Sequence, residues 1–289
     1  MESIISGVFD NALTVGFDSS SKIVIMSDCH RGDGSFADDF IHNQNIMHTA
    51  LSYYYNNGYT YIELGDGDEL WENSSFELIS AVNANIFNIM SKFYQKKRLY
   101  LIYGNHDMVK KYPEWVENNF TNGLSELHEK EQALFPKIQI HEGIILNNAE
   151  SGHKIFLLHG HQADFFNYKL WRLAMFLVRY VWHPLQLLAF HDPSSPSPKI
   201  NPRLEKWAEE HNCLVIAGHT HHVFFPPPKT SMYFNDGCCV YPYFISAIEI
   251  EGGNVSLIKW STKSRADGVL YVGRDIFQTE RIEDYYKII

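Results

Sequence analysis

The chain has 289 residues, of which 45% are hydrophobic and 15% aromatic, and its formal net charge at pH 7 is -10. This length and apolar content allow one large domain with a substantial core and exclude a mostly disordered chain. The negative charge argues against a general nucleic-acid-binding protein, because nucleic acids attract an excess of Lys and Arg. The opening residues lack a basic stretch followed by an apolar one, so we expect no secretory signal and a cytoplasmic location.

Five short apolar runs are the main signal of secondary structure, and each is followed by residues that can bind a metal. The runs are residues 22–27, 61–64, 99–103, 154–158 and 213–217. Short runs rich in Val, Ile and Leu are typical of buried parallel strands. In open α/β sheets, reactive groups gather beyond the carboxyl ends of the strands. The pattern therefore predicts a single site built from five strand tips.

Helical patterns separate the first three of these runs. Apolar residues recur at helical spacing over residues 38–57 and again over 76–95, which predicts alternating strands and helices with a largely parallel sheet. After residue 240 the pattern changes to three β-segments separated by turns, at 244–250, 254–260 and 268–272. This change predicts a meander that forms a second sheet.

The segment 165–190 is unusually apolar and aromatic for a connection between strands. Charged residues and a proline interrupt it, so we expect two helices and no bilayer span. Between residues 169 and 206 there are six Lys and Arg against two acidic residues, a local excess of +4. We expect a helical insertion at 165–205 within a single domain of residues 1–289. It could pack on the domain, act as a lid, touch a membrane peripherally through 165–190, or form a dimer contact.

The polar residues after the five runs offer oxygen and nitrogen donors without a thiolate. Asp28 and His30 are two residues apart, which in an extended strand end puts both side chains on one side. Asp66 adds a carboxylate that can bridge two cations. The candidate metal ligands are Asp28, His30, Asp66, Asn105, His159, His219 and His221. Seven donors are too many for one ion, so we expect two divalent ions, with manganese as the first expectation and iron or zinc as alternatives.

The order of these motifs resembles a known family. D-x-H at Asp28, G-D at Asp66, G-N-H-D at 104–107, the single His159 and G-H-T-H at 218–221 look like the calcineurin-like metallophosphoesterase superfamily. The resemblance covers roughly residues 22–250. We therefore expect an α/β fold, a four-layer α-β-β-α sandwich of two mixed sheets, with the helical insertion near the mouth of the site.

The resemblance also assigns roles by position. It implies a first metal held by Asp28, His30, Asp66 and His221, and a second held by Asp66, Asn105, His159 and His219. His106 matches the histidine that stabilises the phosphoryl transition state or protonates the leaving oxygen, and Asp107 matches the carboxylate that orients it. From the residues alone, His161 remains an alternative to His159 as the ligand after the fourth run.

Residues 65–71 further resemble the G-D-x-x-E-x-W stretch of the UDP-diacylglucosamine pyrophosphatase branch of the superfamily. The chain departs from that branch in two places. His106 stands where the branch typically carries arginine, and His159-Gly160-His161 stands where H-G-D is usual. The resemblance to the branch implies a lipid-linked or nucleotide-linked substrate.

Four more residues are candidate substrate contacts, namely Arg31, Asp68, Glu69 and His161. Arg31 could meet a substrate phosphate or belong to an ordinary charged loop. Asp68 and Glu69 could hold the ligands in place from behind or form the acidic first turn of a helix.

The expected function is hydrolysis of phosphate esters or pyrophosphates by a dimetal-dependent enzyme, through in-line attack of a metal-bridging hydroxide. The expected partner is a phosphorylated small molecule, either lipid-linked or a nucleotide. Two alternatives stay open. One is a phosphoprotein or nucleotide phosphatase, and the other is a non-catalytic metal-binding scaffold that uses the insertion to bind a partner. The sequence leaves the oligomeric state open.

Overall fold

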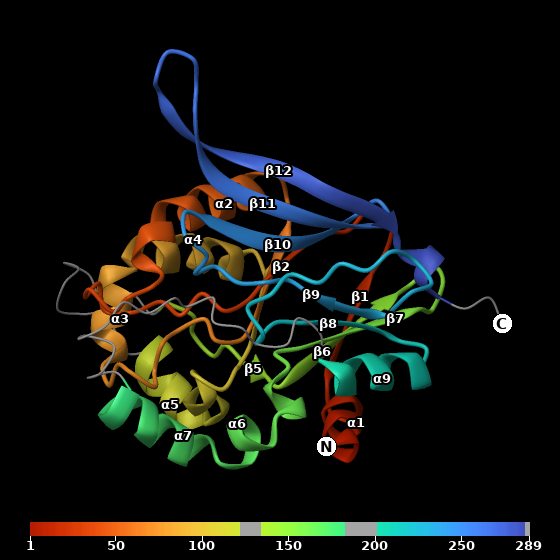
Figure 1. The fold of residues 1–289 in the computed structure, drawn as a ribbon, viewed down its shortest axis with the longest axis horizontal. Coiled ribbons are helices and arrows are strands. Elements are labelled where there is room, and N and C mark those ends of the chain that lie inside the picture. Colours follow the sequence, from red (N-terminus) through yellow and green to blue (C-terminus); the bar gives the residue numbers. More distant parts are fainter. Residues whose placement is uncertain (122–133, 183–200, 287–289) are drawn as a thin grey trace.

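The computed structural model describes residues 1–121, 134–182 and 201–286. Within these residues two mixed sheets face each other, and helices cover their outer sides (Figure 1). The larger sheet has seven described strands in the order β12-β11-β10-β2-β3-β4-β5, and the smaller has five in the order β1-β6-β7-β8-β9. The expected four-layer α-β-β-α sandwich of two mixed sheets is confirmed.

The larger sheet joins a parallel half to an antiparallel half. The parallel strands are β2 (Lys22–Met26), β3 (Thr60–Leu64), β4 (Leu99–Ile102) and β5 (Ile140–His141). The antiparallel strands are β10 (Phe244–Glu251), β11 (Asn254–Ser264) and β12 (Leu270–Arg281). Because β10 pairs with β2, the meander extends the first sheet, and the prediction that it forms a second sheet is wrong.

The smaller sheet contains the last two of the five predicted ligand strands. Its strands are β1 (Leu13–Phe17), β6 (Gly143–Asn148), β7 (Lys154–Leu158), β8 (Leu214–Ala217) and β9 (Tyr233–Asn235). Only the β6–β7 pair is antiparallel among these described strands. The five ligand strands are thus divided between two facing sheets.

Alternating side chains of the central strands build the layers. On β2, Ile23 and Ile25 pack toward the smaller sheet, and Val24 and Met26 pack toward the helices on the other face. This alternation is the period of two that any strand imposes on its side chains. The helices on that face are α2 (Gln44–Asn56), which follows the 3-10 turn η1 (Ile41–Asn43), α3 (Phe76–Val82) and α4 (Ala84–Gln95). On the far side of the smaller sheet lie α1 (Glu2–Asp10) and α9 (Pro202–Glu210).

The single helix predicted over 76–95 is interrupted at Asn83. The backbone there turns to φ -101° and ψ 26°, and the side-chain amide donates to the carbonyls of Gly32 and Ile79. An asparagine that competes for backbone groups in this way favours a break between helices. The hydrogen bond from Asn83 to Gly32 connects the junction of α3 and α4 to the loop that follows β2.

Shorter elements complete the described chain. They are η2 (Met108–Lys111), α5 (Pro113–Val116), η3 (Glu117–Thr121), η4 (His161–Ala163) and η6 (Ile282–Tyr285). The insertion begins with α6 (Phe165–Lys169), α7 (Trp171–Leu177) and the π-helical turn η5 (Val178–Trp182) at the lower edge of Figure 1. Residues 183–200 of the predicted insertion lie outside the described residues. Within the described chain, no helix combines the length and the apolar character needed to cross a bilayer.

Candidate metal centre

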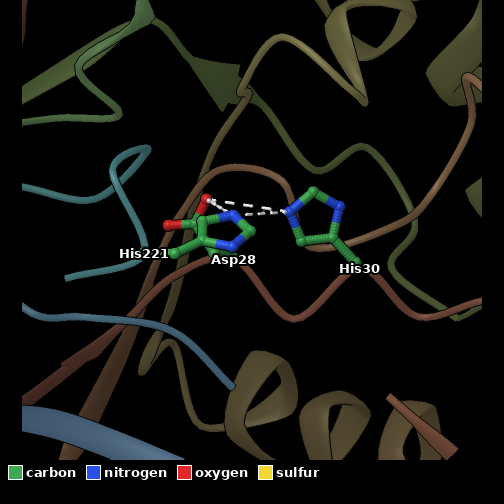
Figure 2. A group of neighbouring side chains, drawn as sticks. All are labelled: Asp28, His30 and His221. Atoms are coloured by element: carbon green, nitrogen blue, oxygen red, sulfur yellow. Dashed lines mark hydrogen bonds and ion pairs between the residues drawn. The ribbon is translucent and has the colours of Figure 1, made fainter. Parts of the chain in front are cut away.

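The candidate ligands lie on the loops that leave the carboxyl ends of β2, β3, β4, β7 and β8, where the two sheets meet. Their donor atoms form two compact groups. One group contains Asp28, His30 and His221, and the other contains Asp66, His159 and His219. Figure 2 shows the first group, with both imidazoles turned toward the carboxylate. The structure thus brings together residues as far apart in the sequence as Asp28 and His221.

Five ligand residues have a backbone conformation that non-glycine residues seldom adopt. The φ angles are 50° at Asp28, 46° at His30, 48° at Asp66, 70° at His219 and 56° at His221. Left-handed conformations of this kind cost roughly 1–3 kcal/mol each and cluster at functional sites. Asp28 and His30 lie in one donor group, as predicted, but the extended strand end predicted for them is wrong, because β2 ends at Met26 and both residues lie in this left-handed loop.

The first group is a set of donors that converge on one another. The Nε2 atoms of His30 and His221 are 3.1 Å apart, and His221 Nε2 is 3.1 Å from Asp28 Oδ1. Asp28 is fully buried, and its Oδ1 accepts no hydrogen bond from the described residues. A buried, unsatisfied carboxylate oxygen facing two imidazole nitrogens fits a divalent cation.

Asp28 is held in place by His219 and by two residues that were not predicted for the site, Ser27 and Asp236. Its Oδ2 accepts from the His219 backbone N–H at 2.9 Å and from the hydroxyl of Ser27, which also lies 2.8 Å from Asp236 Oδ1. A side chain on Gly218 would collide with Ser27 and Asp28. This packing explains the glycine that opens the G-H-T-H motif.

The second group is built around Asp66 and His159. His159 Nε2 lies 3.0 Å from Asp66 Oδ2 and 3.2 Å from Asn105 Oδ1. Its Nδ1 donates to the Leu64 carbonyl at 2.8 Å, which leaves the Nε2 lone pair for the group. Asp66 Oδ2 is also 3.9 Å from His30 Nε2, so this carboxylate lies between the two groups.

After the fourth run, the structure places His159 in the second donor group and His161 outside both groups. His161 is fully buried, and neither ring nitrogen has a hydrogen-bond partner among the described residues. Burial, together with the nearby charge of His159, lowers the pKa of His161 well below its ordinary value, so the ring is neutral. His161 packs beside Tyr103 and Tyr168 and is absent from both groups.

Carboxylates and imidazoles in the centre shift each other's pKa. Burial alone would raise the pKa of Asp66, but the imidazoles of His159 and His106 lower it below its ordinary value. Burial alone would lower the pKa of His159, but Asp66 and Asp28 raise it to about 9. Without a metal, protons on the imidazoles balance the buried carboxylates, and a divalent cation would take their place.

His106 lies beside the two groups and is oriented by Glu69. Its Nδ1 is 2.7 Å from Glu69 Oε2, and its ring stacks on Trp71 with centroids 4.2 Å apart. The predicted orienting group, Asp107, has other partners, because its oxygens accept from the backbone N–H groups of Gly67 and Gly104 and from Lys110. Glu69 therefore takes the orienting role that the resemblance implied for Asp107.

Glu69 also contacts His30, and this contact accounts for a third cluster of donors formed by His30, Glu69 and His106. His30 Nδ1 lies 2.7 Å from Glu69 Oε2, while its Nε2 faces the first group. A carboxylate on the far nitrogen of a ligating histidine fixes the ring and its tautomer. In the third cluster, Glu69 therefore supports both His30 and His106 from behind.

Arg31 and Asp68 do not lie where a substrate could touch them. The Arg31 guanidinium is fully buried, with two bonds to Glu63 at 2.7 and 2.9 Å and one to Asp68 at 2.7 Å. The other oxygen of Asp68 is 2.6 Å from Lys110 Nζ. These residues form a buried ion-pair network beneath the ligand loops, which differs from the substrate contacts predicted for them.

A cavity of about 140 Å³ opens beside the first group and beside His106. Its described lining contains five carboxylates and no Lys or Arg. The acidic residues are Asp33, Asp38, Asp39, Glu69 and Glu72. A phosphate in this cavity would meet negative charge unless cations were held at the ligand groups.

Among similar solved structures, each likeness is distant. Vacuolar Protein Sorting 29 from Cryptosporidium parvum is 16% identical, with a TM-score of 0.39, over 90% of this chain and 99% of that chain. Vps29 from Entamoeba histolytica, solved with Zn²⁺, is 14% identical, with a TM-score of 0.39, over 89% and 99%. Vps29 from Chaetomium thermophilum is 10% identical, with a TM-score of 0.40, over 91% and 98%. Likeness at this level carries no argument about function.

The sequence itself gives a firmer comparison. No curated protein matches the chain. The family model for the calcineurin-like phosphoesterase matches residues 21–223, a segment that contains both ligand groups and His106. This match extends over well more than half of the 289 residues. The chain belongs to the calcineurin-like phosphoesterase family.

Proposed function

We propose that the protein is a phosphoesterase that holds two divalent metal ions and hydrolyses phosphate esters or pyrophosphates. One observation supports this most directly. Two groups of donors lie next to each other, the Asp66 carboxylate of the second group also faces His30 of the first, and His106 lines the cavity that opens on the first group. Manganese is the metal expected first from the mixed carboxylate, amide and imidazole donors.

The ligand residues have defined tasks in this proposal. Asp28, His30 and His221 would hold one ion, and Asn105, His159 and His219 the other, with Asp66 shared between them. Bound metal ions would neutralise phosphate oxygens and lower the pKa of a bound water, which provides a nucleophile at neutral pH. The acidic lining of the cavity makes this neutralisation necessary, because no described Lys or Arg lines it.

His106 would protonate the leaving oxygen. Its Nδ1 is occupied by Glu69, so Nε2 is the nitrogen that remains for a ligand in the cavity. Burial lowers the pKa of His106, but the charges of Glu69 and Asp66 outweigh burial and raise it, which favours the protonated, donating form. Proton donation to a leaving group by a positioned histidine contributes about 10²–10⁴-fold to a rate.

Metal removal tests the proposal. A chelator followed by dialysis should lower turnover of a nitrophenyl phosphodiester by at least about 100-fold, and added Mn²⁺ should restore it, because the cations supply both charge neutralisation and the nucleophile. Turnover and metal content are measured on the same sample. Full activity in metal-free protein would rule out the proposed chemistry.

The natural substrate requires a comparison of substrate classes. Lipid-linked pyrophosphates, nucleotides and phosphopeptides should be assayed side by side with Mn²⁺. Preference for a lipid-linked or nucleotide-linked pyrophosphate would support the narrower resemblance of residues 65–71, and preference for phosphopeptides would favour a phosphoprotein phosphatase. Bound metal without turnover of any of these would favour the non-catalytic scaffold.

The outward face of the insertion favours a peripheral membrane contact as part of the same proposal. Its large apolar side chains are exposed, and the exposed Lys169 and Arg172 lie among them. The exposed apolar residues are Phe165, Phe166, Leu170, Leu173, Phe176, Tyr180 and Val181. Apolar residues among basic ones suit the surface of an anionic membrane. We propose that this face rests on such a surface.

A vesicle-binding assay tests this contact. Replacing Leu173 and Phe176 by Glu should weaken binding to vesicles rich in anionic lipid by about tenfold or more, because it removes apolar burial and adds repulsion. Leu78→Glu is the matched control, since Leu78 is an exposed leucine of α3, outside the insertion. Equal binding of all three proteins, or no binding by the unmodified protein, would favour a lid or a dimer contact.

A further inference from the structure

The turn of residues 69–72 holds His106 on two sides. The Glu69 carboxylate meets His106 Nδ1, and the Trp71 ring stacks on the imidazole at an interplanar angle of 23°. The same carboxylate accepts from the backbone N–H groups of Trp71 and Glu72, at 3.1 and 3.2 Å. The position of His106 therefore depends on the conformation of this turn.

Among the described residues, no hydrogen bond holds the Trp71 ring in place. Its indole N–H has no partner among the described residues, although the side chain is only 3% exposed. The ring is held by packing in a small apolar cluster with Tyr103 and Met108 of the domain and with Trp171 and Ala174 of α7. The insertion therefore supplies part of the packing that holds Trp71 against His106.

Arg179 of η5 secures the other side of the same turn. Its Nε donates to the Trp71 carbonyl and its Nη2 to the Leu70 carbonyl, each at 2.8 Å, and Nη2 lies 3.4 Å from the Asn73 carbonyl. The planar fork of arginine can span consecutive carbonyls, whereas the single ammonium of lysine cannot match that geometry. Arg179 is partly buried, while its neighbour Tyr180 faces outward.

We infer that Arg179 is a positioning residue for catalysis, which fixes the turn of Glu69 and Trp71 and thereby holds His106 at the angle needed to protonate the leaving oxygen. This inference rests on the proposed function, because it requires His106 to assist the leaving group. It gives the insertion a role in the reaction that is separate from any membrane contact. A misplacement of a catalytic group by about 1 Å can cost a large factor in rate.

Leaving-group dependence provides the test. Arg179→Gln should lower kcat for an alkyl phosphodiester by about tenfold with little change in KM, since that leaving oxygen needs a proton. For a nitrophenyl phosphodiester, whose leaving group needs little protonation, kcat should change by less than about twofold. Arg179→Lys should fall between Arg179→Gln and the unmodified protein, because it keeps the charge and one hydrogen bond.

A double-mutant cycle separates positioning from general damage. In a His106→Ala background, Arg179→Gln should cause no further loss on the alkyl ester, because residues that act through one another are not additive. Arg98→Gln is the matched control. This arginine also donates to two backbone carbonyls, those of Tyr59 at 2.7 Å and Tyr55 at 3.2 Å, but it lies at the amino end of β4, opposite the ligand loops, so the change should leave both esters unaffected.

The outcomes distinguish this inference from the proposed function. Equal losses on both esters, or the same loss with and without His106, would overturn the role of Arg179 while leaving the metal-dependent reaction intact. An unchanged rate on the alkyl ester in His106→Ala alone would instead overturn the leaving-group role of His106, and with it the role of Arg179.

Discussion

Replacing Asp66 by Asn is expected to lower metal-dependent turnover by about 10³–10⁴-fold while the protein stays folded. Asp66 Oδ2 lies close to donors of both groups, 3.0 Å from His159 Nε2 and 3.9 Å from His30 Nε2. Losing its charge removes several kcal/mol of metal-based stabilisation of the transition state, and each 1.4 kcal/mol is about tenfold in rate. The measurement is kcat/KM at saturating Mn²⁺, with metal content determined in parallel.

The choice of Asn separates chemistry from folding. The Asp66 side chain also accepts the His106 backbone N–H at 2.7 Å, and an Asn carbonyl can keep that bond. The matched control is Asp18→Asn, a half-buried carboxylate before the start of β2 and therefore at the opposite end of the strand from the site. Turnover close to that of the unmodified protein in Asp66→Asn would refute the assignment of Asp66 to the metals.

The sequence indicated the strands and the fold class, but not how the strands pair. Each ligand follows a run of apolar residues, and strand length and position can be read from such runs. Strand pairing cannot be read from them, because alternation shows that a segment is a strand but not which strand lies beside it. The pairing of β10 with β2, which makes one sheet from two predicted ones, is a tertiary contact of this kind.

The residue that orients His106 could not be predicted from the sequence, because the conformation of individual turns decides it. Glu69 and Asp107 are both carboxylates near His106, and only the direction of each turn decides which one reaches the imidazole. Asp107 turns toward Lys110 and two backbone N–H groups, so Glu69 meets His106 instead. The break at Asn83 likewise depends on a bond to Gly32, 51 positions away.

The glycine of the G-N-H-D motif, Gly104, has a structural reason that only the folded chain shows. A side chain on Gly104 would collide with Asp66 Oδ1, so only glycine allows the third ligand loop to approach the shared carboxylate. The G-N-H-D motif therefore records a close approach between two loops as well as the donors it carries. The motif therefore predicts this close approach wherever it occurs. The role of Arg31 depends on its buried partners Glu63 and Asp68, which no motif specifies.

Arg31→Met is expected to lower the free energy of unfolding by about 3–5 kcal/mol, as found when one partner of a buried ion pair is removed. Glu63 and Asp68 are almost fully buried and would both lose the guanidinium that they share. Chemical denaturation of the purified protein measures the change. Arg281→Met is the matched control, because Arg281 pairs with Glu283 at an exposed site, where such a pair contributes about 0–1 kcal/mol.

A second substitution tests whether the loss comes from stranded buried charge. Adding Glu63→Gln to Arg31→Met should recover part of the stability, because the neutral amide no longer needs the cation, and the two losses should be less than additive. A substrate contact at Arg31 would behave differently. It would raise KM for phosphate substrates in Arg31→Met and leave the unfolding free energy close to that of the control, so the pair of measurements decides whether Arg31 supports the loops or binds substrate.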